Sequence, residues 1–349
     1  MARMMMHVDL TDRQHLILRY VIDEYVATGK PVGSKTLVER YPLGVSSATV
    51  RNEFAVLEEK GLLEHPHRSA GSVPTDRGYR VYVERYAGQA NLSAGEQLMI
   101  RHQFKQVETQ LEGWLQLSAA VLADFAGHLA MVTSPHNRIV RLRRFELLSL
   151  QPRLALMIIV TQDSSVSQAV LRFDREVSQS ELTQTSGRLN DMFENSTASE
   201  IIARRQAFDG IDALVLEQLI STLQAEESGS RAELVHDGLE HIVRQPEFHE
   251  SERMHRIVTL LRGGALLTLL LPQIDWYRDD VQVFIGEELD ADLLQPYGIV
   301  IGSYGLDSNI SGLIGIVGPR RMYYERSIST VRYMADLMSD MMQELYYRD

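Results

Sequence analysis

The chain begins with three short helical segments that are separated by turn residues. This pattern strongly limits the fold that the first part of the chain can adopt. Thr11 and Gln14 form a capping box that starts the first helix, which ends at Gly29. A second helix is expected within residues 33–41, and a third from Ser46 to Gly61. The tight turns between the segments predict a helix-turn-helix arrangement.

The third helix is followed by signals for a strand and a loop. Val50, Phe54 and Leu57 fall at positions i, i+4 and i+7, which defines its buried stripe. Residues 62–74 are typical of an edge strand and a loop containing Gly and Pro, and residues 75–86 return as helix or strand. Three helices, a strand and a projecting loop are the order of a winged helix-turn-helix.

The side of the third helix opposite this stripe carries small residues and two polar ones. Ala48 is small enough to let the start of the helix enter a major groove, with Thr49 at the edge of that face. Arg51 can form two hydrogen bonds to the edge of a guanine, and Asn52 can form two to the edge of an adenine. Taken alone, the helix is better explained as an ordinary capped surface helix, but with the preceding turn and the following loop included DNA binding becomes the better interpretation.

Residues on the second helix, on the third helix and in the following loop are therefore expected to contact DNA. The loop has a basic tip that suits a phosphate or a minor groove, although a plain hairpin loop is the alternative. The expected contact residues are Ser34, Lys35, Thr36, Ser46, Ser47, Ala48, Thr49, Arg51, Asn52, His67, Arg68 and Ser69.

Composition excludes several other classes of protein. The 349 residues predict two or three domains, and the absence of cysteine excludes disulfides, thiolate zinc sites and a cysteine nucleophile. The net charge is −12, but residues 1–88 hold 12 Lys and Arg against 11 Asp and Glu, so the acidity belongs to the remainder. No apolar run is long enough for a signal peptide or a bilayer span, which predicts a cytoplasmic protein.

The rest of the chain predicts a mixed α+β domain that carries an insertion. Residues 89–130 are expected to be helical. Strands are expected at residues 139–148, 154–161 and 166–173, and again from residue 265 onward, where 265–271 is an apolar run. A helical block between these two groups includes an apolar helix that is predicted to form a dimer contact through Leu214, Val215, Leu219 and Leu223.

Catalytic, metal and cofactor sites are not expected. His236, His241, His249 and His255 lack the spacing of a zinc site, so a solvated helical face explains them better. The glycine-containing segments near the end of the chain lack the strand-to-helix setting of a phosphate loop. No arrangement of a nucleophile, a base and an acid is recognisable, which argues against an enzyme.

Six blocks in order along the chain resemble the family of the heat-inducible transcription repressor HrcA. They lie at residues 31–37, 46–63, 65–83, 238–248, 283–288 and 314–333. One departure concerns the loop, where this chain has Ser72 at a position at which members of the family commonly have Arg. Arg68 stands where they usually have a small polar residue.

The resemblance implies a domain order, a target and a partner. It implies a winged-helix DNA-binding domain at 1–88, a helical connector at 89–130, a GAF-like domain at 131–175 and 251–349, and an inserted dimerisation domain at 176–250. It also implies a homodimeric repressor that binds an inverted-repeat operator of chaperone operons and depends on the chaperonin. The rival hypothesis is a regulator controlled by a small-molecule effector in the GAF-like domain, which rests on fold analogy alone.

Overall fold

The computed structural model describes residues 8–67, 70–106, 111–229, 232–248, 251–261, 264–276, 278, 280–306 and 310–346. The fold is mixed α+β with antiparallel strand pairs, as predicted. The chain divides into two compact units. The first unit comprises Met1–Thr133, Leu234–Tyr304 and Leu313–Asp349, and the second comprises Ser134–Glu233 and Gly305–Gly312.

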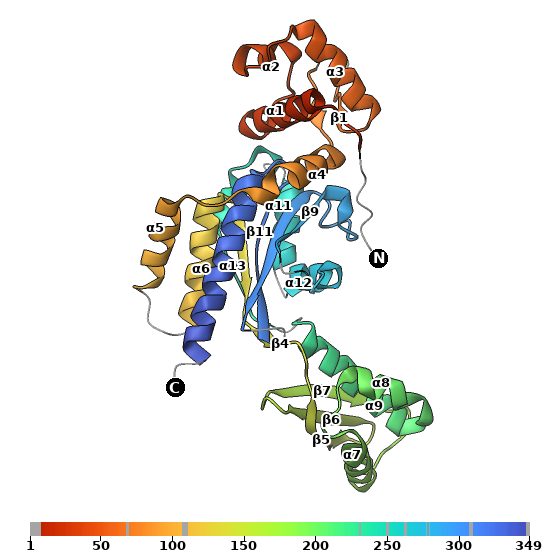
Figure 1. The fold of residues 1–349 in the computed structure, drawn as a ribbon. Helices are drawn as coiled ribbons and strands as arrows, with labels where there is room; N and C mark the ends of the chain where they lie inside the picture. The colour runs from red at the N-terminus through yellow and green to blue at the C-terminus, as the bar shows by residue number, and fades with distance from the viewer. Residues whose placement is uncertain are drawn as a thin grey trace. The chain divides into compact units, whose positions relative to one another are not determined.

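The N-terminal part of the first unit, here called the head (residues 8–86), contains the predicted three helices (Figure 1). Its elements are α1 (Asp12–Thr28), α2 (Ser34–Arg40), α3 (Ser47–Glu59), β1 (Leu63–Glu64), β2 (Val73–Pro74) and α4 (Asp76–Arg85). The capping box of Thr11 and Gln14 is present in both directions. The stripe of Val50, Phe54 and Leu57 is buried, as its spacing predicted.

The remainder of the first unit, here called the body, is a sheet covered by helices on both faces (Figure 1). The sheet runs in the order β8-β3-β11-β10-β9. Helix α6 packs on β3 and against α13, whereas leucines of α11 and α12 share a core with the other side of the strands. The elements are α5 (Ala94–Phe104), α6 (Leu111–Ala126), β3 (Leu129–Thr133), β8 (Leu234–Asp237), α10 (Leu239–Val243), α11 (Ser251–Leu261), α12 (Ala265–Leu270), β9 (Gln282–Ile285), β10 (Tyr297–Gly305), β11 (Ile310–Pro319) and α13 (Tyr324–Tyr346).

The second unit is a three-stranded antiparallel sheet with helices on one face (Figure 1). Its elements are β4 (His136–Asn137), β5 (Leu142–Gln151), β6 (Leu154–Thr161), β7 (Val166–Arg172), α7 (Gln179–Phe193), α8 (Ala198–Arg204) and α9 (Gly210–Glu227). Strand β6 lies between β5 and β7, with Leu156 opposite both Leu148 and Val170. Alternate residues of β6, such as Met157 and Ile159, are buried in the core under the helices.

Three features differ from the sequence-based expectations. Strands β5–β7 pack with α7–α9, so the compact unit begins at Ser134 and not at residue 176. Residues 265–271 form helix α12 and a following 3-10 turn, because an apolar run of this length fits a buried helix as well as a strand. The segment 89–130 is not helical throughout, since β3 begins at Leu129 and α6 belongs to the core of the body.

One buried side chain in the body lacks compensating hydrogen bonds. His128 lies between α6 and β3 with only 5% of its surface exposed, and neither ring nitrogen has a hydrogen-bond partner among the described residues. Burial, assisted by the neighbouring side chains of His241 and Arg321, lowers the pKa of His128 from 6.5 to about 4. The imidazole is therefore neutral in the folded protein at neutral pH.

We expect His128 to make the fold sensitive to acid. The unfolded chain takes up a proton near pH 6.5, whereas the folded chain does so only near pH 4, so the free energy of unfolding falls as the pH drops through this window. The loss amounts to about 3 kcal/mol for this group. Urea unfolding of His128→Leu and His128→Gln should show a shallower pH dependence than the parent, while His255→Gln, which alters an exposed histidine, should not. Parallel curves for all four proteins would contradict the assignment.

Candidate nucleic-acid interface

Helix α3 is held in place from its buried side by α1. The stripe of α3 packs in a core that includes Ile17 and Val21 of α1, both fully buried. Glu53 of α3 accepts a hydrogen bond from Nε2 of Gln14 at 3.1 Å and forms an ion pair with Arg13 at 3.5 Å. The N-terminal turn of α1 thus fixes the middle of α3, which leaves the opposite face of α3 available.

The first turn of α3 is closed by its own side chains. Ser46 is the N-cap residue, and its Oγ accepts a hydrogen bond from the backbone N–H of Thr49 at 3.2 Å. The two hydroxyl groups of Ser46 and Thr49 are 3.1 Å apart. The Ser46 hydroxyl, expected to contact DNA, is therefore engaged in the cap, and the remaining free N–H groups of the first turn are the donors available to an anion.

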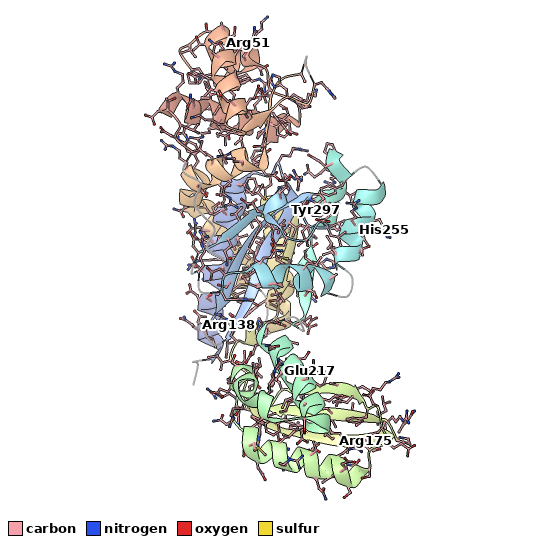
Figure 2. The ribbon with its side chains drawn as sticks, turned by 90° about the vertical axis from the view of Figure 1, so that its right-hand side faces the viewer. Arg51, Arg138, Arg175, Glu217, His255 and Tyr297 are labelled. Atoms are coloured by element: carbon pink, nitrogen blue, oxygen red, sulfur yellow. The ribbon has the colours of Figure 1, made fainter. Side chains whose placement is uncertain are left out.

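The predicted base-reading residues share the open face of α3. Ala48, Arg51 and Asn52 are all exposed, and Figure 2 shows Arg51 on the outer side of the head. Ser47 and Thr49 are half-buried beside them. The structure thus brings a small residue and the two polar side chains together on one surface, one helical turn from the start of the helix.

Helix α2 contributes less than the sequence predicted. Lys35 is exposed and Thr36 is half-buried, but Ser34 is buried, so its side chain does not lie on the open surface. The position of α2 depends on Glu24, a buried carboxylate of α1 that accepts a hydrogen bond from Nη1 of Arg40 at 2.6 Å. Sequence reasoning missed Glu24, although a charged residue directly beside the apolar stripe of α1 is a usable signal.

The loop between β1 and β2 returns close to the start of α2. Val32 and Ser72 exchange two backbone hydrogen bonds, at 2.9 and 3.0 Å. A Cβ atom on Gly71 would lie 2.4 Å from the carbonyl carbon of Val32, so only glycine permits this approach. His67 in the loop is exposed, whereas Arg68 and Ser69 lie outside the described residues.

Helix α4 joins the head to the body through polar contacts. The carboxylate of Asp76 accepts hydrogen bonds from the backbone N–H of Glu287 at 3.0 Å and from Nη1 of Arg320 at 3.2 Å. Gly286 has a φ of +55°, and a Cβ there would lie 1.9 Å from Oδ2 of Asp76, so any side chain would displace α4. One turn later, Arg80 donates to the carbonyl oxygen of Val283 at 2.7 Å.

The same junction borders a cleft of about 890 Å³ inside the first unit. Its lining includes Asp76 and Arg320, which pair with each other, and Glu247 and Arg321, which also pair. Arg321 further donates to the carbonyl oxygen of Val26 at the end of α1, at 3.2 Å. Beside this cleft the head is therefore attached to the body by the Asp76–Arg320 ion pair and by the hydrogen bond from Arg321 to Val26.

The predicted dimer residues pack into the core of their own unit. Val215, Leu219 and Leu223 are fully buried in the core that α9 shares with strands β5–β7, and Leu214 is a half-buried residue packed against that core. Their side chains are committed to their own unit and are unavailable to a second copy. The apolar face of α9 reflects intramolecular packing, which a single sequence cannot distinguish from an interface.

Within the described ranges, no group of three or more His, Asp or Glu residues is arranged to hold a metal ion. None of the helices described in the structure is long and apolar enough to cross a membrane.

Comparison with known proteins gives consistent matches. Residues 112–328 match the family model described as HrcA protein C terminal domain. The heat-inducible transcription repressor HrcA of Thermomicrobium roseum is 45% identical over 97% of this chain and 97% of its own length. The protein of the same name from Herpetosiphon aurantiacus is 41% identical over 98% of each chain. A solved structure described as a hypothetical protein at 2.2 Å resolution superposes with a TM-score of 0.58 over 96% of this chain and 99% of its own, at 22% identity, and so shows the same fold.

Proposed function

The chain belongs to the HrcA family of heat-inducible transcription repressors, as its sequence blocks predicted, and we propose that it represses heat-shock chaperone operons by binding an inverted-repeat operator as a dimer. The proposed location is the cytoplasm, where such operators lie. In this proposal the head is a winged helix-turn-helix, the body is a GAF-like domain, and the second unit is the dimerisation domain.

The separation of the two faces of α3 is the observation that carries DNA binding. One face is buried on α1, while the other presents Ala48, Arg51 and Asn52 to solvent. An exposed helix with small and hydrogen-bonding residues at its start has the shape and donor pattern for the major groove. Lys35 on α2 is also exposed, which suits a phosphate contact beside the groove.

Substitutions on this face should separate base reading from phosphate binding. Arg51→Ala and Asn52→Ala should each weaken operator binding by about 1–3 kcal/mol and leave binding to random DNA nearly unchanged. Lys35→Ala should weaken both and reduce the salt slope by about one on a log-log plot. Ala48→Glu should abolish operator binding, because it blocks entry into the groove and repels phosphates.

Titrations against operator and scrambled duplexes at two salt concentrations test these outcomes. The melting temperature should stay at the parental value for the Arg51, Asn52 and Ala48 variants, since all three side chains are exposed. Equal losses on both duplexes for Arg51→Ala and Asn52→Ala would show that α3 does not read the bases.

The open face of the sheet in the second unit supports dimerisation. Helices cover one face of β5–β7, while Leu148, Leu150, Val166 and Val170 are exposed to between 45% and 61%. Leu156 lies between Leu148 and Val170 on that open face. Contiguous exposed apolar side chains of this kind are typical of protein interfaces, and a two-fold repressor requires a second copy.

Charges placed on this sheet face should dissociate the dimer. We expect Val166→Lys combined with Val170→Lys to sediment as a folded monomer, because both residues are more than half exposed and lie outside the core of their own unit. Ser221→Lys combined with Gln224→Lys puts two lysines on the exposed side of α9 and should stay dimeric. The pair Leu219→Glu and Leu223→Glu should instead unfold the second unit. A dimeric sheet variant would exclude this face.

The proposal that the activity of this protein depends on the chaperonin is supported by its family and by the topology of the sheet in the body. Strand β3 pairs with β8 and β11, so the sheet of the body closes only after a whole second unit has been synthesised. Folding that waits for distant strands leaves apolar surface exposed for longer and favours aggregation.

We expect refolding with chaperonin and ATP to recover more operator-binding protein than refolding without them. An equal mass of serum albumin serves as the control for nonspecific protection. Equal recovery with chaperonin, with albumin and with buffer over a range of temperatures would contradict the dependence.

A further inference from the structure

Three DNA-facing segments of the head meet at one buried residue. Ser72 is fully buried at the base of the loop between β1 and β2, here called the wing (residues 65–72). Its backbone is paired on both sides with Val32, which lies just before α2. Its hydroxyl donates a hydrogen bond to Oε1 of Glu58 in the last turn of α3, at 2.9 Å. Ser72 thus connects the wing to both helices of the helix-turn-helix.

His65 at the other end of the wing joins the same group. Its Nδ1 lies 2.9 Å from Oε1 of Glu58 and 3.1 Å from Oγ of Ser72. A carboxylate only accepts hydrogen bonds, so the Ser72 hydroxyl is the donor to Glu58, and this bond to a charged oxygen is charge-assisted. The His65 ring contacts both that oxygen and the Ser72 hydroxyl, so the two ends of the wing meet at one oxygen of α3.

The wing has little else to orient it among the described residues. Its strands pair through only two positions, Leu63 with Pro74 and Glu64 with Val73. A two-stranded hairpin this short is marginally stable alone. The position of the wing relative to α3 must then come mainly from the contacts of Glu58 and from the backbone pairing at Val32.

We propose that Glu58 is a positioning residue, which acts through Ser72 and His65 to hold the wing against α2 and α3 in the orientation that fits the operator. The proposal rests on DNA binding by the head. It also assigns a role to Ser72, which stands where members of the family commonly have Arg: a buried serine orients the wing and does not itself touch DNA.

Electrostatic repulsion alone predicts the opposite effect on DNA affinity when the carboxylate of Glu58 is removed. Removing a carboxylate near DNA reduces repulsion of the phosphates, so it should raise the affinity for any sequence. Removing a positioning residue should lower the affinity for the operator in spite of that gain. Glu59 is the matched control, because it is an exposed carboxylate on the neighbouring position of the same helix.

The first experiment measures the wing without DNA. Amide hydrogen exchange is followed in the full-length parent, Glu58→Ala, Ser72→Ala and Glu59→Ala. We expect faster exchange at Val32 and Ser72 for the first two variants and parental exchange for Glu59→Ala, with the α1 amides protected in all four as evidence that the head is folded. Parental exchange at Val32 and Ser72 in Glu58→Ala would overturn the proposal, whether or not the protein binds DNA.

The second experiment measures the wing on DNA. Glu58→Ala should weaken operator binding on the order of tenfold, while Glu59→Ala should bind as well as the parent or slightly better. Glu58→Gln keeps an acceptor oxygen in place and should recover most of the loss. Because the chain has no cysteine, an iron chelate attached through Pro66→Cys marks the wing alone. It should cleave the operator at a sharp position in the parent background and at a broadened one with Glu58→Ala.

These outcomes separate the inference from the function it rests on. A parent protein that shows no preference for the operator overturns the proposed function, and the exchange data then decide the wing contact alone. A parent that prefers the operator, with equal binding and equally sharp cleavage for Glu58→Ala and Glu59→Ala, overturns the positioning role while DNA binding stands.

Discussion

The pairing of β3 with β8 is the constraint on which the rest of the structure depends. Thr133 at the end of β3 faces Leu234 at the start of β8, so the chain leaves the sheet and re-enters it at one point. Ser134 and Glu233 extend the pairing, with the N–H of Ser134 donating to the carbonyl oxygen of Glu233 at 2.9 Å. The side chain of Thr133 accepts a further hydrogen bond from the N–H of Leu313 at 2.9 Å, which fixes β11 beside β3. An insertion closed in this way folds around its own core and leaves the order of the interrupted strands unchanged.

Local interactions explain which parts of this arrangement the sequence predicted. The capping box of Thr11 and the stripe of Val50 on α3 depend on residues within two turns of each other, so their pattern is legible without a structure. The packing partners of a sheet, in contrast, depend on residues far apart in the sequence. Strands β5–β7 were recognisable as strands, but the sequence did not show which helices cover them. The leucines of α9 show the same limit, since an apolar helix face does not reveal whether its partner is the same chain or another.

The candidate site follows the same division. The exposure of Arg51 and Asn52 follows from the helical period, and it was predicted. The burial of Ser34 was not predicted, and the cap formed by Ser46 was only the alternative interpretation, because a hydroxyl at a helix start has two uses, capping the helix or binding a ligand. The contact between Glu58 and Ser72 joins residues that are 14 positions apart, and only the fold brings them together.

The distribution of charge along the chain explains why the geometry of the head matters for the proposed DNA binding. Residues 1–88 carry a net charge of only +1 and the rest of the chain −13, so general attraction to phosphates contributes little to the proposed binding. In the proposed complex, affinity must then come from hydrogen bonds in the grooves and from the two heads of a dimer that engage one operator together. Both contributions require fixed geometry, because a misdirected helix loses its base contacts and a misdirected head loses the second half-site. The close contact of Asp76 with Gly286 and the ion pairs around α4 supply that rigidity between head and body, as the Glu58 contacts do within the head. In the DNA binding proposed for this acidic protein, specificity therefore depends on the contacts that hold the reading elements in place as much as on the residues expected to touch the bases.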